Sequence, residues 1–235
     1  MSDNKVSKRL GFNDLTPSEW ALLSKNVVNE DDLCNPVWND LSSPRNEYQK
    51  EHGAVFPVKL AERLIKMYSK EGDLIFDPFM GIGSTAIAAL NHKRGAKGTE
   101  LNPKFASIAQ QWIAEQNGLF GGVLPCDVYN DDCRNMCNYV NEGDVQLTVT
   151  SPPYADFIQR SLKDRSTTHK TSLITHANNS TVKQYSEEVN DFGNLPYKEF
   201  LEQIKGVLKD NLHITKSGGY SAWVVKDYRD TKHKI

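Results

Sequence analysis

Short apolar segments of strand length alternate with segments of helical periodicity along most of this 235-residue chain. The strand candidates are residues 74–76, 95–100, 120–128, 145–150 and 220–225. The helix candidates are residues 57–69, 84–91, 103–116, 130–140 and 196–208. Strands that alternate with helices form βαβ units, whose parallel strands are covered by helices on both faces. The sequence therefore predicts an α/β fold with a mostly parallel sheet.

Composition narrows the class of protein. With 38% hydrophobic and 25% charged residues, the chain can bury a core and has an ordinary charge content. Its net charge of −2 argues against unspecific coating of nucleic acid, although a local basic groove remains compatible with it. The four cysteines are irregularly spaced, which favours reduced thiols over a zinc site. No signal peptide or membrane span is evident, so we expect no membrane partner and a cytoplasmic protein.

The pattern also suggests boundaries within the chain. We expect an N-terminal extension over residues 1–44, with a short helix that Thr16 caps and Pro17 begins. The main domain then covers residues 45–235. Residues 155–195 within it form an irregular loop insertion with a local excess of basic side chains. Such a loop is either a solvated surface or a DNA-facing one.

A double proline follows the fourth strand candidate, in Ser151-Pro152-Pro153-Tyr154. Because proline cannot continue a ladder, the strand must stop there. The turn presents a hydroxyl, backbone carbonyls and an aromatic ring at the carboxyl end of a strand, the edge where open α/β sheets bind ligands. This turn can accept hydrogen bonds from an amino group while the ring stacks on a base.

A second motif follows the first strand candidate, where residues 77–85 read Asp-Pro-Phe-Met-Gly-Ile-Gly-Ser-Thr. Glycines there let the backbone approach a ligand closely, next to the free N–H groups of a helix N-terminus. The third glycine of a dinucleotide fingerprint is absent, and no P-loop lysine follows. Asp77 would suit a cationic ligand group better than a phosphate.

Together, these motifs resemble those of the amino-methylating DNA methyltransferases, which methylate cytosine N4 or adenine N6. The catalytic motif of that family is (D/N/S)-P-P-(Y/F/W), and residues 77–85 resemble its S-adenosylmethionine motif. The resemblance covers residues 45–154 and, more weakly, 196–228, and we expect none in the first 40 residues or the loop. In this chain the cofactor motif precedes the catalytic one, whereas many S-P-P-Y enzymes have the reverse order.

The resemblance implies S-adenosylmethionine as the cofactor and a set of site residues. The implied catalytic residues are Ser151, Pro152, Pro153 and Tyr154. The implied cofactor-binding residues are Phe56, Pro57, Asp77, Pro78, Phe79, Gly81, Gly83, Ser84, Thr85, Glu100 and Asp132. Glu100 would hold the ribose hydroxyls. Asp132 would accept a hydrogen bond from the adenine amino group of the cofactor. Asp127 and Asp131 are alternative candidates for this role. No metal is implied, and Cys126 is expected to be an unreactive thiol rather than a cytosine C5 nucleophile.

The resemblance also implies the fold and the substrate. We expect a Rossmann-like class I methyltransferase fold with strand order 3-2-1-4-5, apparently lacking the family's final antiparallel strand pair. The substrate would be double-stranded DNA with a flipped-out base. In this family, serine at the first position of the catalytic motif favours cytosine N4 as the methylated atom, with adenine N6 as the alternative. A further alternative is a truncated or non-catalytic relative that binds cofactor or DNA and needs a partner chain. A partner chain or a homo-oligomer is therefore a candidate assembly.

Overall fold

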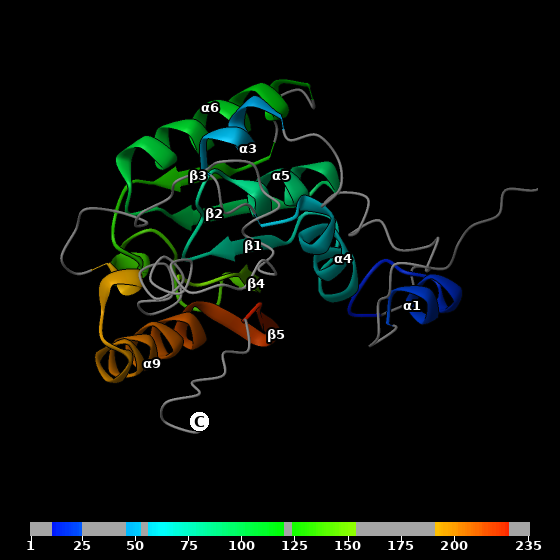
Figure 1. Cartoon of the computed structure of the whole chain (residues 1–235). Helices are drawn as coiled ribbons and strands as arrows, with labels where there is room; N and C mark the ends of the chain where they lie inside the picture. Colours follow the sequence, from blue (N-terminus) through cyan, green and yellow to red (C-terminus); the bar gives the residue numbers. More distant parts are fainter. Residues whose placement is uncertain (1–10, 25–45, 53–55, 120–123, 154–190, 226–235) are drawn as a thin grey trace, which may run out of the picture.

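A single parallel sheet organises the structure. The structure is a computed structural model that describes residues 11–24, 46–52, 56–119, 124–153 and 191–225 (Figure 1). Its strands are β1 Leu74–Asp77, β2 Gly95–Thr99, β3 Cys126–Tyr129, β4 Val145–Thr150 and β5 Thr215–Trp223. Within the described residues they lie in the order β3-β2-β1-β4-β5, and every pairing is parallel. The predicted Rossmann-like order is thus confirmed.

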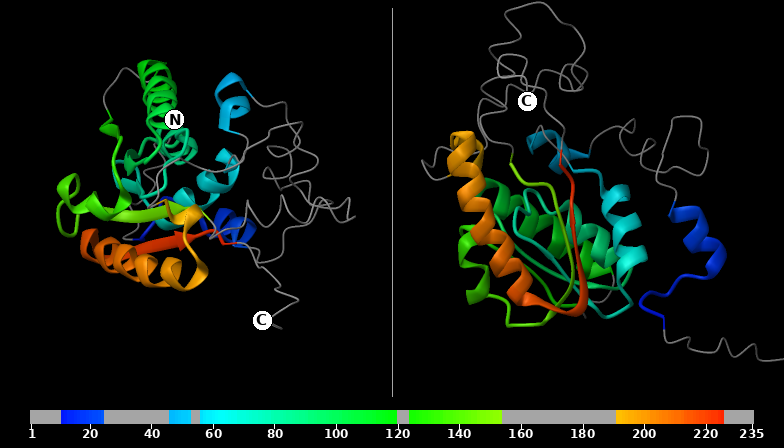
Figure 2. Two further views of the ribbon diagram at one scale, coloured as in Figure 1. Left: turned by 60° about the vertical axis from the view of Figure 1, so that its left-hand side comes forward. Right: turned by 90° about the horizontal axis from the view of Figure 1, so that it is seen from below.

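Helices cover both faces of the sheet, as predicted. The helices on one face are α4 Val58–Tyr68, α5 Ser84–Asn91 and α6 Pro103–Leu119, and the short helix α3 Glu47–His52 contacts α6. The other face carries the 3-10 helices η1 Cys133–Asn138 and η2 Phe192–Asn194 and the long helix α9 Tyr197–Ile214. In the right-hand view of Figure 2, α4 and α9 run antiparallel to the strands. Their N-terminal ends therefore lie beside the carboxyl ends of the strands.

The last strand differs from its prediction. β5 begins at Thr215, five residues before the predicted start, so Gly218-Gly219 lies inside the strand instead of before it. Val145 pairs with Thr215 but Leu147 pairs with Tyr220, so β5 bulges between these two pairs. Gly218 has a φ of +78°, and a Cβ on Gly219 would lie 2.7 Å from Thr215 Cγ2. A glycine pair that reads as a turn in the sequence thus forms a bulge in the sheet.

Two further segments also differ from expectation. Residues 130–140 contain the six-residue 3-10 helix η1 rather than an α-helix, and Asp132 caps it by accepting from the backbone N–H of Arg134. The end of the predicted loop, residues 191–195, contains η2. Phe192 is buried there because its ring packs against Phe79 and Phe200. The rest of that loop, residues 155–190, lies outside the described residues.

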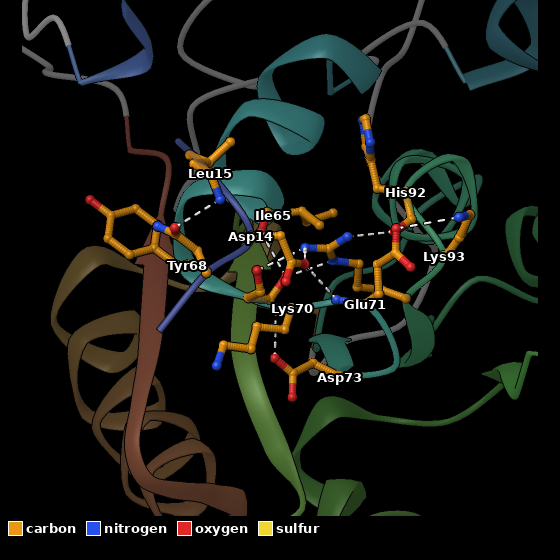
Figure 3. A network of polar contacts seen from close by, with 12 residues as sticks. Asp14, Leu15, Ile65, Tyr68, Lys70, Glu71, Asp73, His92 and Lys93 are labelled. Carbon is orange, nitrogen blue, oxygen red and sulfur yellow. Dashed lines mark hydrogen bonds and ion pairs between the residues drawn. The ribbon is translucent and has the colours of Figure 1, made fainter. Parts of the chain in front are cut away.

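The N-terminal segment is anchored to the main domain. Its helix α1, Pro17–Leu23, starts with the predicted Thr16 cap. The side chain of Arg94 is only 5% exposed, and its Nη2 donates to Asp14 Oδ2 at 2.9 Å. The guanidinium also donates to the carbonyls of Ser69 and His92. Figure 3 shows the residues that meet at this point, and their contacts attach residues 11–24 to the sheet domain.

We expect the Asp14→Ala substitution to lower the free energy of unfolding by about 2 kcal/mol, because the buried Arg94 guanidinium loses the carboxylate to which it is hydrogen-bonded. Asp14 is itself 49% exposed, which keeps the loss below that of a fully buried pair. Thermal unfolding measures the effect. The matched control is Glu202→Ala, which removes an exposed ion pair with Lys205 and should cost no more than about 0.5 kcal/mol. Equal effects of the two substitutions would contradict the anchoring role of Asp14.

Candidate functional site

The strand order reverses between β1 and β4, because the chain passes from β3 at one edge of the sheet to β4 beside β1. In open α/β sheets, ligands bind outside the carboxyl ends of the strands at such a switch point. Both predicted motifs lie there, one following β1 and the other following β4. The candidate site is therefore the carboxyl edge of β1, β2 and β4.

Asp77 joins three elements at this edge. Its carboxylate accepts hydrogen bonds from Thr85 Oγ1 and Thr150 Oγ1, each at 2.6 Å, and from the Phe79 N–H at 2.9 Å. Asp77 is 4% exposed, and this burial raises its pKa to about 6, although the three hydrogen bonds oppose the shift. The carboxylate thus ties β1 to α5 and β4. A contact of Asp77 with a cofactor stays a prediction.

The glycine motif forms a tight turn into α5. Gly81 and Gly83 have φ values of +55° and +96°, and Gly83 is the N-cap of α5. A Cβ on Gly83 would also lie 3.3 Å from the Cβ of Ala109 on α6. At the first helical position, the buried Ser84 hydroxyl makes no hydrogen bond within the described part of the chain. This turn offers backbone N–H groups and one unsatisfied hydroxyl at a helix N-terminus.

Glu100 follows β2 and faces the same turn. Its carboxylate accepts the N–H of Gly81 and the N–H of Asn102, both at 2.8 Å. Burial raises the pKa of Glu100 to about 7, and the charges of Asp77 and Asp191 add to the shift. A carboxylate has about four acceptor positions, so two remain for ligand donors. Two hydroxyls of a ribose match that capacity.

The raised pKa values predict that the protein without ligand is less stable at pH 8 than at pH 5. A carboxyl group whose pKa is higher in the folded state stabilises the fold below its unfolded pKa, and this contribution is lost as the pH rises through the folded pKa. For Asp77 and Glu100, that loss falls between about pH 4 and pH 7. We expect the unfolding midpoint to fall by roughly 5 °C between pH 5 and pH 8. Glu100→Gln should flatten this dependence, and an unchanged slope would contradict the assignment to Glu100.

The three acids near the end of β3 occupy different environments. Asp127 lies within the strand rather than at its carboxyl end. Asp131 accepts hydrogen bonds from Tyr139 and Asn135. Asp132 pairs with Arg134 through both of its carboxylate oxygens. Burial raises the pKa of Asp132, but the hydrogen bonds and charge of Arg134 outweigh it, so the pKa is lowered. Asp132 is therefore ionised, with part of its acceptor capacity already used.

The double-proline turn leaves β4 as predicted. β4 ends at Thr150, and the N–H of Val224 donates to the Thr150 carbonyl at 2.9 Å. Pro152 is buried, and Ser151 and Pro153 are partly exposed. Among the described residues, none donates to the Pro152 carbonyl. The implied Tyr154 lies outside the described residues.

The remaining predicted residues also lie near this edge. Pro57 is the N-cap of α4, and Phe56 packs against the core beneath α4 and α5. The Pro78 carbonyl accepts from Thr99 Oγ1 at 2.8 Å, which holds the turn after β1 against β2. Phe79 is partly buried and packs against the core below α9. Burial raises the pKa of Cys126 to about 12, which fits the expected unreactive thiol.

Sequence reasoning missed two residues at this edge. Asp191 is 4% exposed and caps η2 by accepting the N–H of Gly193 at 2.8 Å. It lies in the stretch predicted as loop, where only its capping position before Phe192-Gly193-Asn194 could have marked it. Trp223 ends β5 opposite Thr150, and its ring lies 6.2 Å from that of Phe79. Its place beside the site follows from strand pairing, which the sequence does not display.

Among the described residues, none of the helices is long and apolar enough to cross a membrane. No group of three or more His, Cys, Asp or Glu side chains in those ranges could hold a metal ion.

Comparison with known proteins links the chain to DNA methylases. A family model described as DNA methylase, for N6 and N4 enzymes, matches residues 4–111. The chain is 50% identical over 62 residues to the orphan methyltransferase M.BamHII of Bacillus amyloliquefaciens. The matched segment covers 26% of this chain and 23% of that protein. It is 34% identical over 99 residues to the type II methyltransferase M.BglI of Bacillus subtilis, with coverages of 42% and 25%. The chain thus spans about a quarter of the length of these relatives.

These matches confirm the predicted resemblance to the amino-methylating DNA methyltransferases. They correct one part of it, since the family match begins at residue 4 and includes segments in which no resemblance was expected. Among solved structures, an RNA methyltransferase from Salinibacter ruber in complex with S-adenosyl-L-homocysteine is similar, with a TM-score of 0.35 and 16% identity. That likeness covers 48% of this chain and 67% of the other.

Proposed function

We propose that this chain is an S-adenosylmethionine-dependent DNA methyltransferase that acts on an exocyclic amino group. The observation that carries the proposal is the hydrogen bond between Thr150 and Asp77 at 2.6 Å. It directly joins the strand end that precedes the double-proline turn to the acid that opens the glycine motif. A cofactor at the glycine turn and an amino group at Ser151-Pro152 would therefore lie side by side.

The residues of the glycine turn fit an adenosyl cofactor. The buried Ser84 hydroxyl lacks a partner within the described residues and is available to a polar ligand group. Glu100 keeps acceptor capacity for the ribose, and Asp132 is an ionised acceptor after β3. Gly81 and Gly83 allow close backbone approach, and Phe56 and Pro57 lie at the α4 end of the same edge. When bound, S-adenosylmethionine supplies an activated methyl group on its sulfonium sulfur.

The double-proline turn would position the acceptor. An exocyclic amino nitrogen is a poor nucleophile because its lone pair is delocalised into the ring. The Pro152 carbonyl and the Ser151 hydroxyl would accept hydrogen bonds from the N–H groups of the amino nitrogen. These bonds would favour a more tetrahedral nitrogen, in line with the methyl group. Tyr154 would stack on the base, Pro153 would keep the turn stiff, and the proton lost from the nitrogen would pass to solvent.

The proposed substrate is double-stranded DNA whose target base leaves the helix, because an amino group within the stack cannot reach this edge. Serine at position 151 favours cytosine N4 as the acceptor, with adenine N6 as the alternative. Residues 155–190, which hold the basic stretch of the sequence, are a candidate DNA-facing segment.

Mass spectrometry of nucleosides tests the proposal after incubation of the chain with unmethylated genomic DNA and deuterated-methyl S-adenosylmethionine. Labelled N4-methylcytosine is the expected product. Labelled N6-methyladenine would keep the mechanism and correct the base. The absence of any labelled nucleoside, from a preparation that is folded and binds S-adenosylhomocysteine, would contradict independent catalysis and favour a relative that requires a partner chain.

A further inference from the structure

A chain of polar side chains crosses the interface between α9 and the sheet, where the neighbouring side chains are apolar. Asn211 is 3% exposed, and its Oδ1 accepts from Thr148 Oγ1 at 2.6 Å. Its Nδ2 donates to Ser221 Oγ at 2.9 Å, and Trp223 Nε1 donates to the same Ser221 oxygen at 2.6 Å. A buried amide is costly unless it is hydrogen-bonded, and here both ends are satisfied. The chain of bonds ends on the indole of Trp223 and fixes the orientation of that ring.

Trp223 stands beside the double-proline turn. It pairs in register with Thr150, the residue before Ser151. Side chains two residues apart share one face of a strand, so Trp223 points to the α9 face together with Ser221. The Trp223 ring meets Phe79 from the end of β1 at 6.2 Å between centroids and an angle of 76°. Because β4 lies between β1 and β5, these two rings meet over the end of β4.

The partial exposure of the Phe79 and Trp223 rings indicates that they are accessible to a ligand and are not only part of the core. Phe79 and Trp223 are partly exposed, whereas Phe192, which packs against Phe79 at 5.5 Å, is 4% exposed. The buried Phe192 ring thus supports the accessible Phe79 ring, which in turn meets Trp223. Accessible aromatic faces next to hydroxyl and carbonyl acceptors suit a flat heteroaromatic ring that carries an amino group. A ring already held in place loses little freedom when it receives such a ligand.

We propose that Trp223 forms a wall of the pocket that receives the target nucleobase, and that Asn211 and Ser221 are positioning residues that hold its indole. This inference rests on the proposed methyltransferase function. Trp223 contacts the base in this account, while Asn211 and Ser221 act only through Trp223. The cofactor lies toward β1 and β2, so none of the three contacts it.

Steady-state methylation of unmethylated genomic DNA by the full chain tests the assignment, together with calorimetry of S-adenosylhomocysteine. Loss of one stacked aromatic side chain should lower kcat/KM for DNA in Trp223→Ala by about 10- to 100-fold. Trp223→Phe keeps a ring but lacks the indole donor, so it should lose only a few-fold. Ser221→Ala should match Trp223→Phe. The affinity for S-adenosylhomocysteine should be unchanged in all three variants.

The control is Trp112→Phe, at a buried tryptophan on the opposite face that stacks on Tyr48. It should keep wild-type kinetics. If the wild-type chain methylates DNA and Trp223→Ala has the same kcat/KM, the role of Trp223 would be overturned. The proposed methyltransferase function would stand. A parallel loss of S-adenosylhomocysteine affinity would also overturn it, because the residue would then act on the cofactor or the fold. A folded wild-type chain that binds S-adenosylhomocysteine but methylates no DNA would overturn the proposed function and this inference with it.

Discussion

Replacement of Asp77 by alanine is expected to destabilise the protein by about 3 kcal/mol or more and to weaken cofactor binding at least tenfold. The substitution leaves the Thr85 hydroxyl, the Thr150 hydroxyl and the Phe79 N–H without their acceptor. Each unsatisfied buried donor costs about 1–3 kcal/mol. Relaxation of the surrounding structure offsets part of the total cost of the three unsatisfied donors. The glycine turn would also lose its attachment to β4, so the backbone that faces the cofactor would no longer be held in place.

Thermal unfolding and calorimetric titration of S-adenosylhomocysteine measure these two effects. Asp77→Asn is the matched control, because an amide retains one acceptor oxygen at almost the same size and should lose less on both measures. If Asp77→Ala unfolded at the wild-type temperature and bound S-adenosylhomocysteine normally, Asp77 would have no framework role at this edge.

Replacement of Tyr154 by alanine is expected to lower turnover by about 100-fold while the affinity for S-adenosylhomocysteine stays the same. Loss of a stacking ring costs about 1–3 kcal/mol per base, and poor orientation of the nitrogen adds to the barrier. Tyr154→Phe keeps the ring and should retain most activity. Single-turnover methylation and calorimetry separate the two effects. Equal losses of cofactor affinity in Tyr154→Ala and Asp77→Ala would refute the division of roles between the two motifs.

The sequence predicted regular elements well where local signals are sharp. Helix α5 and strand β4 have the bounds expected for them, because a glycine turn precedes one and a double proline follows the other. The start of β5 was wrong because Gly218-Gly219 has the local signature of a turn. Only its pairing with β4, more than 60 residues away in the chain, makes it a bulge.

The site was predictable in its motifs but not in its contacts. The sequence placed Asp77 and Glu100 at strand ends. It did not show that Asp77 bonds to Thr85 and Thr150, the second of which is 73 positions away. Asp191 and Trp223 reach the same edge through tertiary packing alone. The attachment of the N-terminal segment was missed for the same reason, since Asp14 and Arg94 are 80 positions apart.

In the proposed function, the carboxyl edge around Asp77 and Glu100 holds S-adenosylmethionine, and calorimetric titration of S-adenosylhomocysteine measures this binding. We expect one-to-one binding with a Kd on the order of 10 µM. Glu100→Ala should weaken it by about tenfold or more, because the ribose hydroxyls lose their acceptor. Glu142→Ala, which removes an exposed acid before β4 at the opposite edge, should bind as the wild type does. A folded chain that shows no binding, or a Glu100→Ala variant with wild-type affinity, would contradict the claim.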